Sequence, residues 1–191
     1  MPKLGMEPVR KQQLIEATLD SVYQYGLADT TLQRISEKAG VSPGIIAHYF
    51  GRKEDLLEAT MRAMLTELGR AVVTRQQTAV SPREKLHAII EGNFDFEQIH
   101  PRAATTWLAF WAEALHKPRL GRLQRINQYR LRNNLRYWLK KLLGEPRARS
   151  ASDGLAAMID GLWLRGAFEP GGIDPKRCTT LAREYLEKQL D

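Results

Sequence analysis

The stretch TTLQRISEKAGVSPGIIAHYF, residues Thr30–Phe50, decides the fold of the N-terminal part of this 191-residue chain. It holds two short segments with helical hydrophobic spacing, joined at Gly40-Val41-Ser42, where glycine tolerates a positive φ. The capping-box spacing of Thr30 and Gln33 predicts the start of the first helix. Ser42 followed by Pro43 predicts an N-cap and a first-turn proline for the second. This layout is typical of a helix-turn-helix.

Apolar side chains in this stretch can form a small core that sets the angle between the two helices. The predicted core residues are Leu32, Ile35, Ala39, Val41, Ile46 and Phe50. The second helix then presents Pro43, Gly44, Ile45, Ala47, His48 and Tyr49 outward. Such a face can enter the major groove of DNA, and its free N-terminal amides can meet phosphate. An ordinary helical hairpin has the same spacing, so spacing alone leaves both interpretations open.

The net charge of +7, from 29 basic and 22 acidic residues, favours a polyanionic partner. Residues 1–62 nevertheless carry 8 basic and 8 acidic side chains. Residues 117–149 carry 11 basic side chains and a single acidic one, Glu145. A DNA-binding interpretation of the N-terminal part must therefore rest on its pattern and not on bulk charge.

Composition predicts a globular protein of the reducing cytoplasm without a membrane span. Apolar residues make up 43% and charged residues 27%, and the lone Cys178 excludes an internal disulfide framework. The longest near-continuous apolar stretch, Ala103–Ala112, has about half of the ~20 residues that a span needs. The opening MPKLGMEPVR lacks the apolar core of a signal peptide.

Residues typical of helix starts and helix ends predict an all-α fold of nine helices. The expected helices start near residues 8, 30, 43, 53, 82, 101, 118, 152 and 175. Ser81-Pro82-Arg83-Glu84 combines a capping box with a first-turn proline, and the helix it opens is expected to stop before Pro101. GEPRARS, residues 144–150, is expected to break the chain between helices. We expect a DNA-binding domain over residues 1–52 and an effector-binding and dimerisation domain over residues 53–191.

The run TTLQRISEKAGVSPGIIAHYFGRKEDLL, Thr30–Leu57, closely resembles the signature of the TetR family of bacterial repressors. The glycine-valine-serine turn, the His-Tyr-Phe end of the recognition helix and the lysine that opens the next helix all match that signature. The predicted order of nine helices also fits the architecture of the family. The resemblance implies a transcriptional repressor that is not an enzyme and needs no cofactor beyond an effector ligand.

The resemblance also implies roles for individual residues. Tyr49 and Lys53 match phosphate contacts, with Thr31 at the start of the supporting helix. Base-edge positions of the family fall on Gly44, Ile45, Ala47 and His48. Few of these side chains donate hydrogen bonds, so contact with thymine methyls and readout of DNA shape are expected to carry much of the specificity. Lys3, Arg10 and Lys11 could add contacts from an N-terminal arm.

Aromatic residues concentrate in the C-terminal part, and Trp107, Phe110 and Trp111 share one helix face. Core packing explains any single aromatic. Together with Glu91, Asp95, Glu113 and Asp160, these aromatics also suit a cage for a quaternary ammonium ion, which aromatic faces attract without hydrogen bonds.

Five segments resemble more closely a branch of the TetR family, the choline-responsive repressors of glycine betaine synthesis genes. They are MPKLGMEPVR, SPGIIAHYF, EGNFD, WLAFWAEALH and GLAAMIDGLWLRGAF. The resemblance implies choline or a related quaternary ammonium as effector. It points to Trp107, Trp111 and Trp163 as cage walls, completed by Phe94 or Tyr137, with Asp95 or Asp160 as the counter-charge.

The apolar residues of the last two predicted helices indicate a homodimer. Their apolar positions suit a four-helix bundle across a two-fold axis, although packing within one chain would use the same residues: Leu155, Ile159, Leu162, Leu181, Tyr185 and Leu186. A dimer would set two recognition helices ~34–36 Å apart, one turn of double-stranded operator DNA.

Two alternatives remain at this point. One keeps the DNA-binding half and replaces choline by hydrophobic cations in general. The other is a di-iron helical-bundle oxidase, because Glu-x-x-His spacing recurs at Glu84/His87, Glu97/His100 and Glu113/His116. The bridging glutamates that such a centre needs on two further helices are not evident, so we expect no metal site.

Overall fold

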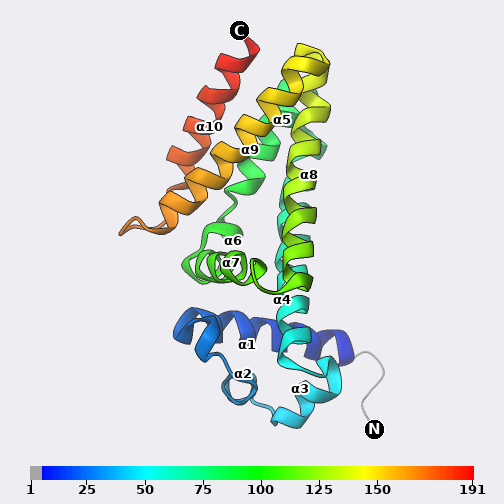
Figure 1. The fold of residues 1–191 in the computed structure, drawn as a ribbon, viewed down its shortest axis with the longest axis vertical. Helices are drawn as coiled ribbons and strands as arrows, with labels where there is room; N and C mark the ends of the chain where they lie inside the picture. Colours follow the sequence, from blue (N-terminus) through cyan, green and yellow to red (C-terminus); the bar gives the residue numbers. More distant parts are fainter. Residues whose placement is uncertain (1–5) are drawn as a thin grey trace. The chain divides into compact units, whose positions relative to one another are not determined.

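The computed structural model describes residues 6–191, and within that range it contains helices and no strand. Nine helices have eight residues or more, as predicted, and a single-turn helix, α6, is added to them. Their bounds are α1 Met6–Asp29, α2 Leu32–Ala39, α3 Pro43–Phe50, α4 Lys53–Thr78, α5 Pro82–Asn93, α6 Phe96–Ile99, α7 Pro101–Ala114, α8 Pro118–Leu143, α9 Glu145–Ala167 and α10 Pro175–Leu190 (Figure 1). None of the described helices is long and apolar enough to cross a membrane.

The chain packs as two compact units. The first comprises the described residues up to Met64 together with Pro101–Leu123, and the second comprises Leu65–His100 together with Gln124–Asp191. Helices α4 and α8 each begin in the first unit and end in the second. The predicted division into a DNA-binding domain, residues 1–52, and an effector-binding and dimerisation domain, residues 53–191, is a division by function and differs from these packing units. It stays a prediction.

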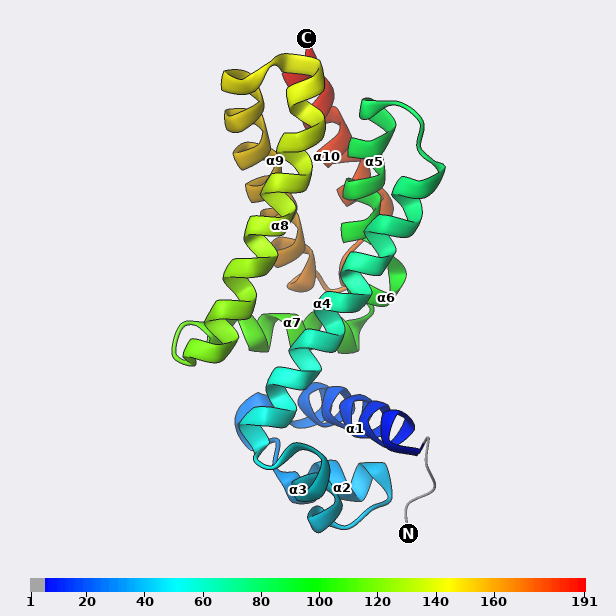
Figure 2. The same cartoon turned by 90° about the vertical axis from the view of Figure 1, so that its right-hand side faces the viewer.

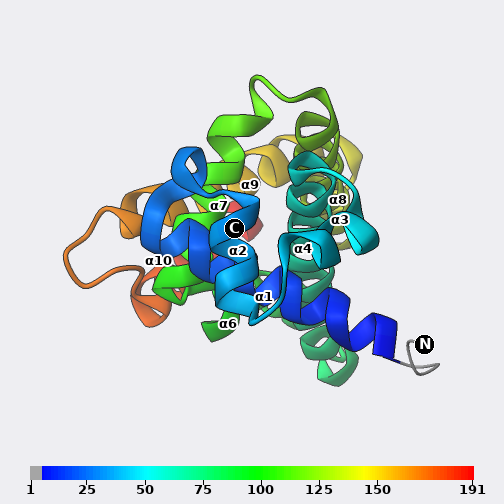
Figure 3. The same cartoon turned by 90° about the horizontal axis from the view of Figure 1, so that it is seen from below.

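The first unit is built around α1, which contacts α2, α3 and α7. Helices α2 and α3 lie on the same side of α1, seen from below in Figure 3. All six residues predicted for the small core lie in this cluster, in which Ile35 and Ile46 are fully buried. Leu14, Ala17 and Leu56 complete it from the flanking helices.

The capping and turn residues at the ends of α2 and α3 agree with the sequence prediction except at the N-cap of α2. The N-cap of α2 is Thr31 and not Thr30, since the Thr31 hydroxyl accepts a hydrogen bond from the Arg34 amide at 3.2 Å. Thr30 instead donates to the Gly26 carbonyl at 2.7 Å, at the end of α1. Gly40 ends α2 with a φ of 63°, the left-handed conformation that favours glycine. Pro43 opens α3 as predicted.

Gly26 interrupts α1 with a non-helical backbone, φ 73° and ψ 166°, so the helical run from Met6 ends there and a short second run follows to Asp29. Two predicted boundaries were wrong. Helix α5 ends at Asn93, because Asp95 caps the separate turn α6. Helix α9 begins at Glu145, so most of residues 144–150 is helical and the break is confined to Gly144. Proline at the second position of α9 is compatible with a first turn, which is why this segment does not break the helix.

In the second unit, α10 packs against α9 and α5 (Figure 2). Gly154 allows the approach of Tyr185, since a Cβ there would lie 2.2 Å from the phenolic oxygen. Leu155, Ile159 and Leu186 are buried within the single chain. These three predicted dimer-face residues are therefore used by intramolecular packing.

Ile46→Ala should lower the free energy of unfolding by about 2–5 kcal/mol, because it leaves a cavity in a fully packed core. The neighbouring change Ile45→Ala is the matched control. Ile45 is 37% exposed, so we expect a loss of less than about 1 kcal/mol. Urea unfolding of both variants measures the difference, and equal losses would contradict the assignment of the two faces of α3.

Candidate nucleic-acid interface and effector site

Helix α3 presents one face outward while Ile46 anchors the other. Gly44, Ile45, Ala47 and His48 are exposed, so all four predicted base-edge residues lie on the accessible side. Tyr49 is half-buried against the core, and its ring meets that of His48 edge to face at 5.0 Å between centroids. The aromatic contact restricts both rings, which gives the outward face a defined shape.

The start of α3 is open to an anion. The Ser42 side chain makes no capping hydrogen bond, so it does not occupy the first amides of the helix. A helix N-terminus with free amides attracts phosphate through its dipole. Thr31, at the start of α2, is exposed.

A cationic group beside Thr31 was not predicted from the sequence. The guanidinium of Arg34 lies over the Tyr25 ring at 4.4 Å from its centroid, and the Lys38 ammonium lies 5.8 Å from the same centroid. Arg34 also donates to the Asp29 carbonyl at 2.6 Å. The pairing spans the turn between two helices, so no spacing rule within one helix would reveal it.

Lys53 begins α4, as predicted, but its side chain is directed inward. The ammonium lies 3.4 Å from the Leu27 carbonyl oxygen and is partly buried. Arg10 forms a hydrogen bond with Gln13, and Lys11 pairs with Glu7, both on exposed parts of α1. Lys3 lies outside the described residues.

The seven predicted effector residues are divided between the two units. Trp107, which is buried, and Trp111 lie on α7 in the first unit. Phe94 and Trp163 are buried in the second unit, where the Trp163 indole donates to the Asn93 carbonyl at 3.0 Å. This bond holds Trp163 against the end of α5, next to Phe94 in the chain. The predicted cage, with the three tryptophans as walls, one further aromatic ring and one carboxylate, stays a prediction.

The two candidate counter-charges differ in how far their charge is compensated. Asp95 caps α6 and forms an ion pair with Arg75. Burial raises the pKa of the Asp160 carboxyl to about 6. Within residues 6–191, no hydrogen bond or ion pair reaches the Asp160 side chain. Of the two candidates, Asp160 is therefore the carboxylate whose charge is not compensated, which makes it the better candidate for a functional role.

Tyr137 lies on an exposed part of α8 and is 57% exposed. Its ring meets Trp138 edge to face at 4.7 Å, and the Lys141 ammonium lies 4.7 Å from the centroid of each ring. This tyrosine therefore already contacts a cation of its own chain.

A cavity of about 460 Å³ opens in the second unit between α4, α5 and α8. Its apolar side includes Leu68 and Val72, and its polar side is formed by the amides Asn93, Asn127, Asn133 and Asn134 with Tyr129 and Arg130. None of the predicted cage residues lines it. The seven-residue spacing of Asn127 and Asn134, which places both on one helix face, was the signal that could have revealed it.

Both members of one Glu-x-x-His pair, Glu84/His87, have other partners. The Glu84 carboxylate accepts from the Val80 and Ser81 amides in the capping box of α5. The His87 imidazole lies 3.1 Å from a Glu187 oxygen. In the part of the chain that the structure describes, no three His, Cys, Asp or Glu side chains are grouped to hold a metal ion.

Asp160→Asn should stabilise the protein at pH 8 by about 1–3 kcal/mol, because the buried carboxylate is costly only when ionised. The unfolded carboxyl ionises near pH 4 and the folded one near 6. The cost therefore grows from about pH 4 and is complete above about pH 6. Urea unfolding at pH 4 and pH 8 measures it, and an equal effect at both would contradict this account.

Asp95→Asn is the matched control for this experiment. Its carboxylate is paired with Arg75, so the substitution should destabilise the protein at pH 8 instead of stabilising it.

Family models match both parts of the chain. Residues 14–60 match the N-terminal model of the TetR family of bacterial regulatory proteins. Residues 82–191 match the C-terminal model of BetI-type transcriptional repressors.

Individual relatives agree with these models. The HTH-type transcriptional regulator BetI 1 of Chromohalobacter salexigens is 54% identical over 191 residues, covering 100% of this chain and 95% of the relative. A crystal structure of a transcriptional regulator from Pseudomonas aeruginosa PAO1 is 28% identical, with a TM-score of 0.83 over 95% of this chain and 90% of that one.

A regulator from Saccharomonospora viridis, crystallised in complex with choline, shares the fold. Its TM-score is 0.82 at 18% identity, over 94% of this chain and 96% of that one. The family is a non-enzymatic class of DNA-binding regulators. The chain therefore belongs to the TetR family of transcriptional regulators, in its branch of BetI-type repressors.

Proposed function

We propose that a homodimer of this protein binds a pseudo-palindromic operator, represses genes of choline-to-glycine-betaine conversion, and responds to choline. The observation that carries the DNA-binding part is the outward face of α3. Ile45, Ala47 and His48 are exposed on a helix whose opposite side is locked by Ile46. A rigid, mostly small and apolar surface suits thymine methyls and close backbone approach in the major groove.

The choline response is supported by chemistry in the C-terminal part and by the relatives. In the second unit, Trp163 supplies an aromatic ring three residues from Asp160 on α9, and Asp160 holds an uncompensated negative charge. A quaternary ammonium ion gains from both and loses little on dehydration. The BetI name of the relative and the choline bound to the Saccharomonospora viridis regulator point to the same ligand.

Transmission to the DNA-binding helices is proposed to run through α7. Arg102, near the start of α7, binds Glu16 at 2.8 Å and Asp20 at 2.9 Å on α1. Trp107 and Trp111 lie further along the same helix. A ligand held by these tryptophans would therefore shift a helix that packs directly on α1, and so change the spacing of the two recognition helices.

A second candidate effector class is the larger hydrophobic cation. The cavity of about 460 Å³ in the second unit is larger than choline needs, and its apolar wall of Leu65, Leu68 and Val72 suits the apolar groups of a larger cation. Calorimetry with choline and with tetraphenylphosphonium separates the two, because each proposal expects tighter binding of its own cation.

An operator titration is the decisive experiment. Purified protein is titrated against DNA upstream of its own gene at a stated salt concentration, with and without choline. We expect specific binding whose affinity or geometry changes with choline. Absence of specific binding at low ionic strength would overturn the proposal.

Lys53→Ala should weaken binding to all DNA sequences and lower the slope of log K against log salt by about 1, as loss of one phosphate contact requires. Lys176→Ala, which removes an exposed charge from α10, is the control for net charge. Equal slopes for the two variants would refute a phosphate contact by Lys53.

Trp111→Ala should spare operator binding and weaken choline binding about tenfold, which corresponds to ~1.4 kcal/mol of lost cation–π attraction. Trp138→Ala, at a tryptophan outside the predicted cage, is the matched control. Calorimetry measures choline affinity in both. Unchanged affinity in Trp111→Ala would remove this residue from the cage.

A further inference from the structure

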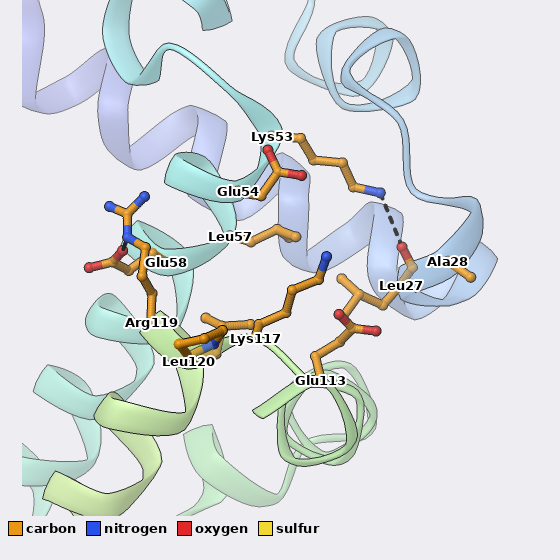
Figure 4. A pocket seen from close by; sticks show the side chains of 11 residues that line it. Leu27, Ala28, Lys53, Glu54, Leu57, Glu58, Glu113, Lys117, Arg119 and Leu120 are labelled. Atoms are coloured by element: carbon orange, nitrogen blue, oxygen red, sulfur yellow. Dashed lines mark hydrogen bonds and ion pairs between the residues drawn. The ribbon is translucent and has the colours of Figure 1, made fainter. Parts of the chain in front are cut away.

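The first unit contains a second cavity, of about 310 Å³, that the proposed function does not use. It lies where the end of α1, the start of α4 and the junction of α7 with α8 meet (Figure 4). Its apolar wall is formed by Leu27, Leu57 and Leu120. A volume of this size, with an apolar wall and a few converging polar groups, is typical of a small-molecule site.

The lining carries three cations and three carboxylates, but only part of this charge is paired. Arg119 binds Asp55 at 2.5 Å and also pairs with Glu58. Glu58 is nearly buried and is held in addition by Arg62 at 2.6 Å. These groups form a closed network on one side of the cavity.

Four lining charges lie outside this network: Lys53, Lys117, Glu113 and Glu54, of which Glu54 is exposed. The ammonium groups of Lys53 and Lys117 both point into the cavity, as does the Glu113 carboxylate (Figure 4). The Lys53 ammonium has the Leu27 carbonyl at 3.4 Å as its acceptor. Over the described range 6–191, no hydrogen bond or ion pair reaches the Lys117 or Glu113 side chain.

We propose that this cavity is a second effector site, which takes a small zwitterion bearing a carboxylate and an ammonium group. A purely anionic ligand would face Glu113, and a purely cationic one would face Lys53 and Lys117. A neutral apolar ligand would desolvate these charges without compensation. A zwitterion places its carboxylate at the two lysines and its ammonium at Glu113, with its carbon frame against the leucines.

Occupation of this site would act on DNA binding through Lys53. The ammonium of Lys53 can bind either a DNA phosphate or the carboxylate of a ligand in the cavity, and not both. The ligand therefore keeps Lys53 directed inward and weakens operator binding. This consequence rests on the proposed function, whereas binding of the zwitterion itself does not.

Three probes with the same carbon frame test the charge requirement: 6-aminohexanoate, hexanoate and hexylamine. Calorimetry with the full-length protein should show binding of 6-aminohexanoate at least about tenfold tighter than of either singly charged probe. Equal affinities, or no binding of 6-aminohexanoate, would overturn the proposal.

Lys117→Ala and Glu113→Gln locate the site. Each should weaken 6-aminohexanoate binding about tenfold or more, while Arg122→Ala, which removes an exposed charge of α8 that does not line the cavity, should leave it unchanged. The far-UV circular dichroism spectrum and the urea unfolding midpoint should be the same in all three variants and in the wild type, which shows that each variant is folded. Wild-type affinity for 6-aminohexanoate in both cavity variants would place its site elsewhere.

The operator titration separates this inference from the proposed function. With 6-aminohexanoate the wild type should bind its operator more weakly, and Lys117→Ala should not respond. Operator binding that ignores 6-aminohexanoate would refute the regulatory role. Zwitterion binding without any operator binding would instead refute the proposed function and leave the site intact.

Discussion

Burial of Ile46 is the constraint on which the recognition helix depends. An eight-residue helix is not stable alone in water, so α3 keeps its form because Ile46 packs with Ile35 and Leu14. The same side chain sets the rotation of the helix about its axis. Its neighbours Ile45 and Ala47 must then face outward, because side chains one position apart point in directions about 100° apart. One buried residue thus determines both the stability of α3 and the surface it presents.

Charge compensation distinguishes the structural carboxylates from the candidate functional one. Asp55 and Glu58 share Arg119, and Asp95 has Arg75. Asp160 bears the cost of burial without a partner, which raises its pKa to about 6. A cationic effector would supply the missing charge, so the cost in the free protein would return as binding energy. The cavity beside Lys53 contains uncompensated charges of both signs. Within residues 6–191, no hydrogen bond or ion pair reaches the Lys117 ammonium or the Glu113 carboxylate there.

Local signals predicted much of the fold. The capping box at Ser81, the proline that opens α3 and the glycine that ends α2 act on residues within four positions of themselves, so they can be recognised in sequence. The errors arose where two local signals competed. Both Thr30 and Thr31 can cap a helix, and Gly144 followed by Glu145 and Pro146 fits either a loop or a first turn. Tertiary packing selected between them.

The sequence by itself determined the family, the helical fold and the outward residues of α3, because these depend on motifs and on periodicity along one helix. Only the tertiary structure decided that α7 packs with α1, that Asp95 is paired while Asp160 is not, and that Lys53 points into a cavity. Each of these depends on contacts between residues far apart in the chain. Trp163 binds a carbonyl 70 positions away, and Arg102 binds a carboxylate 86 positions away. No local rule encodes such pairs, because they form only when separate helices pack together.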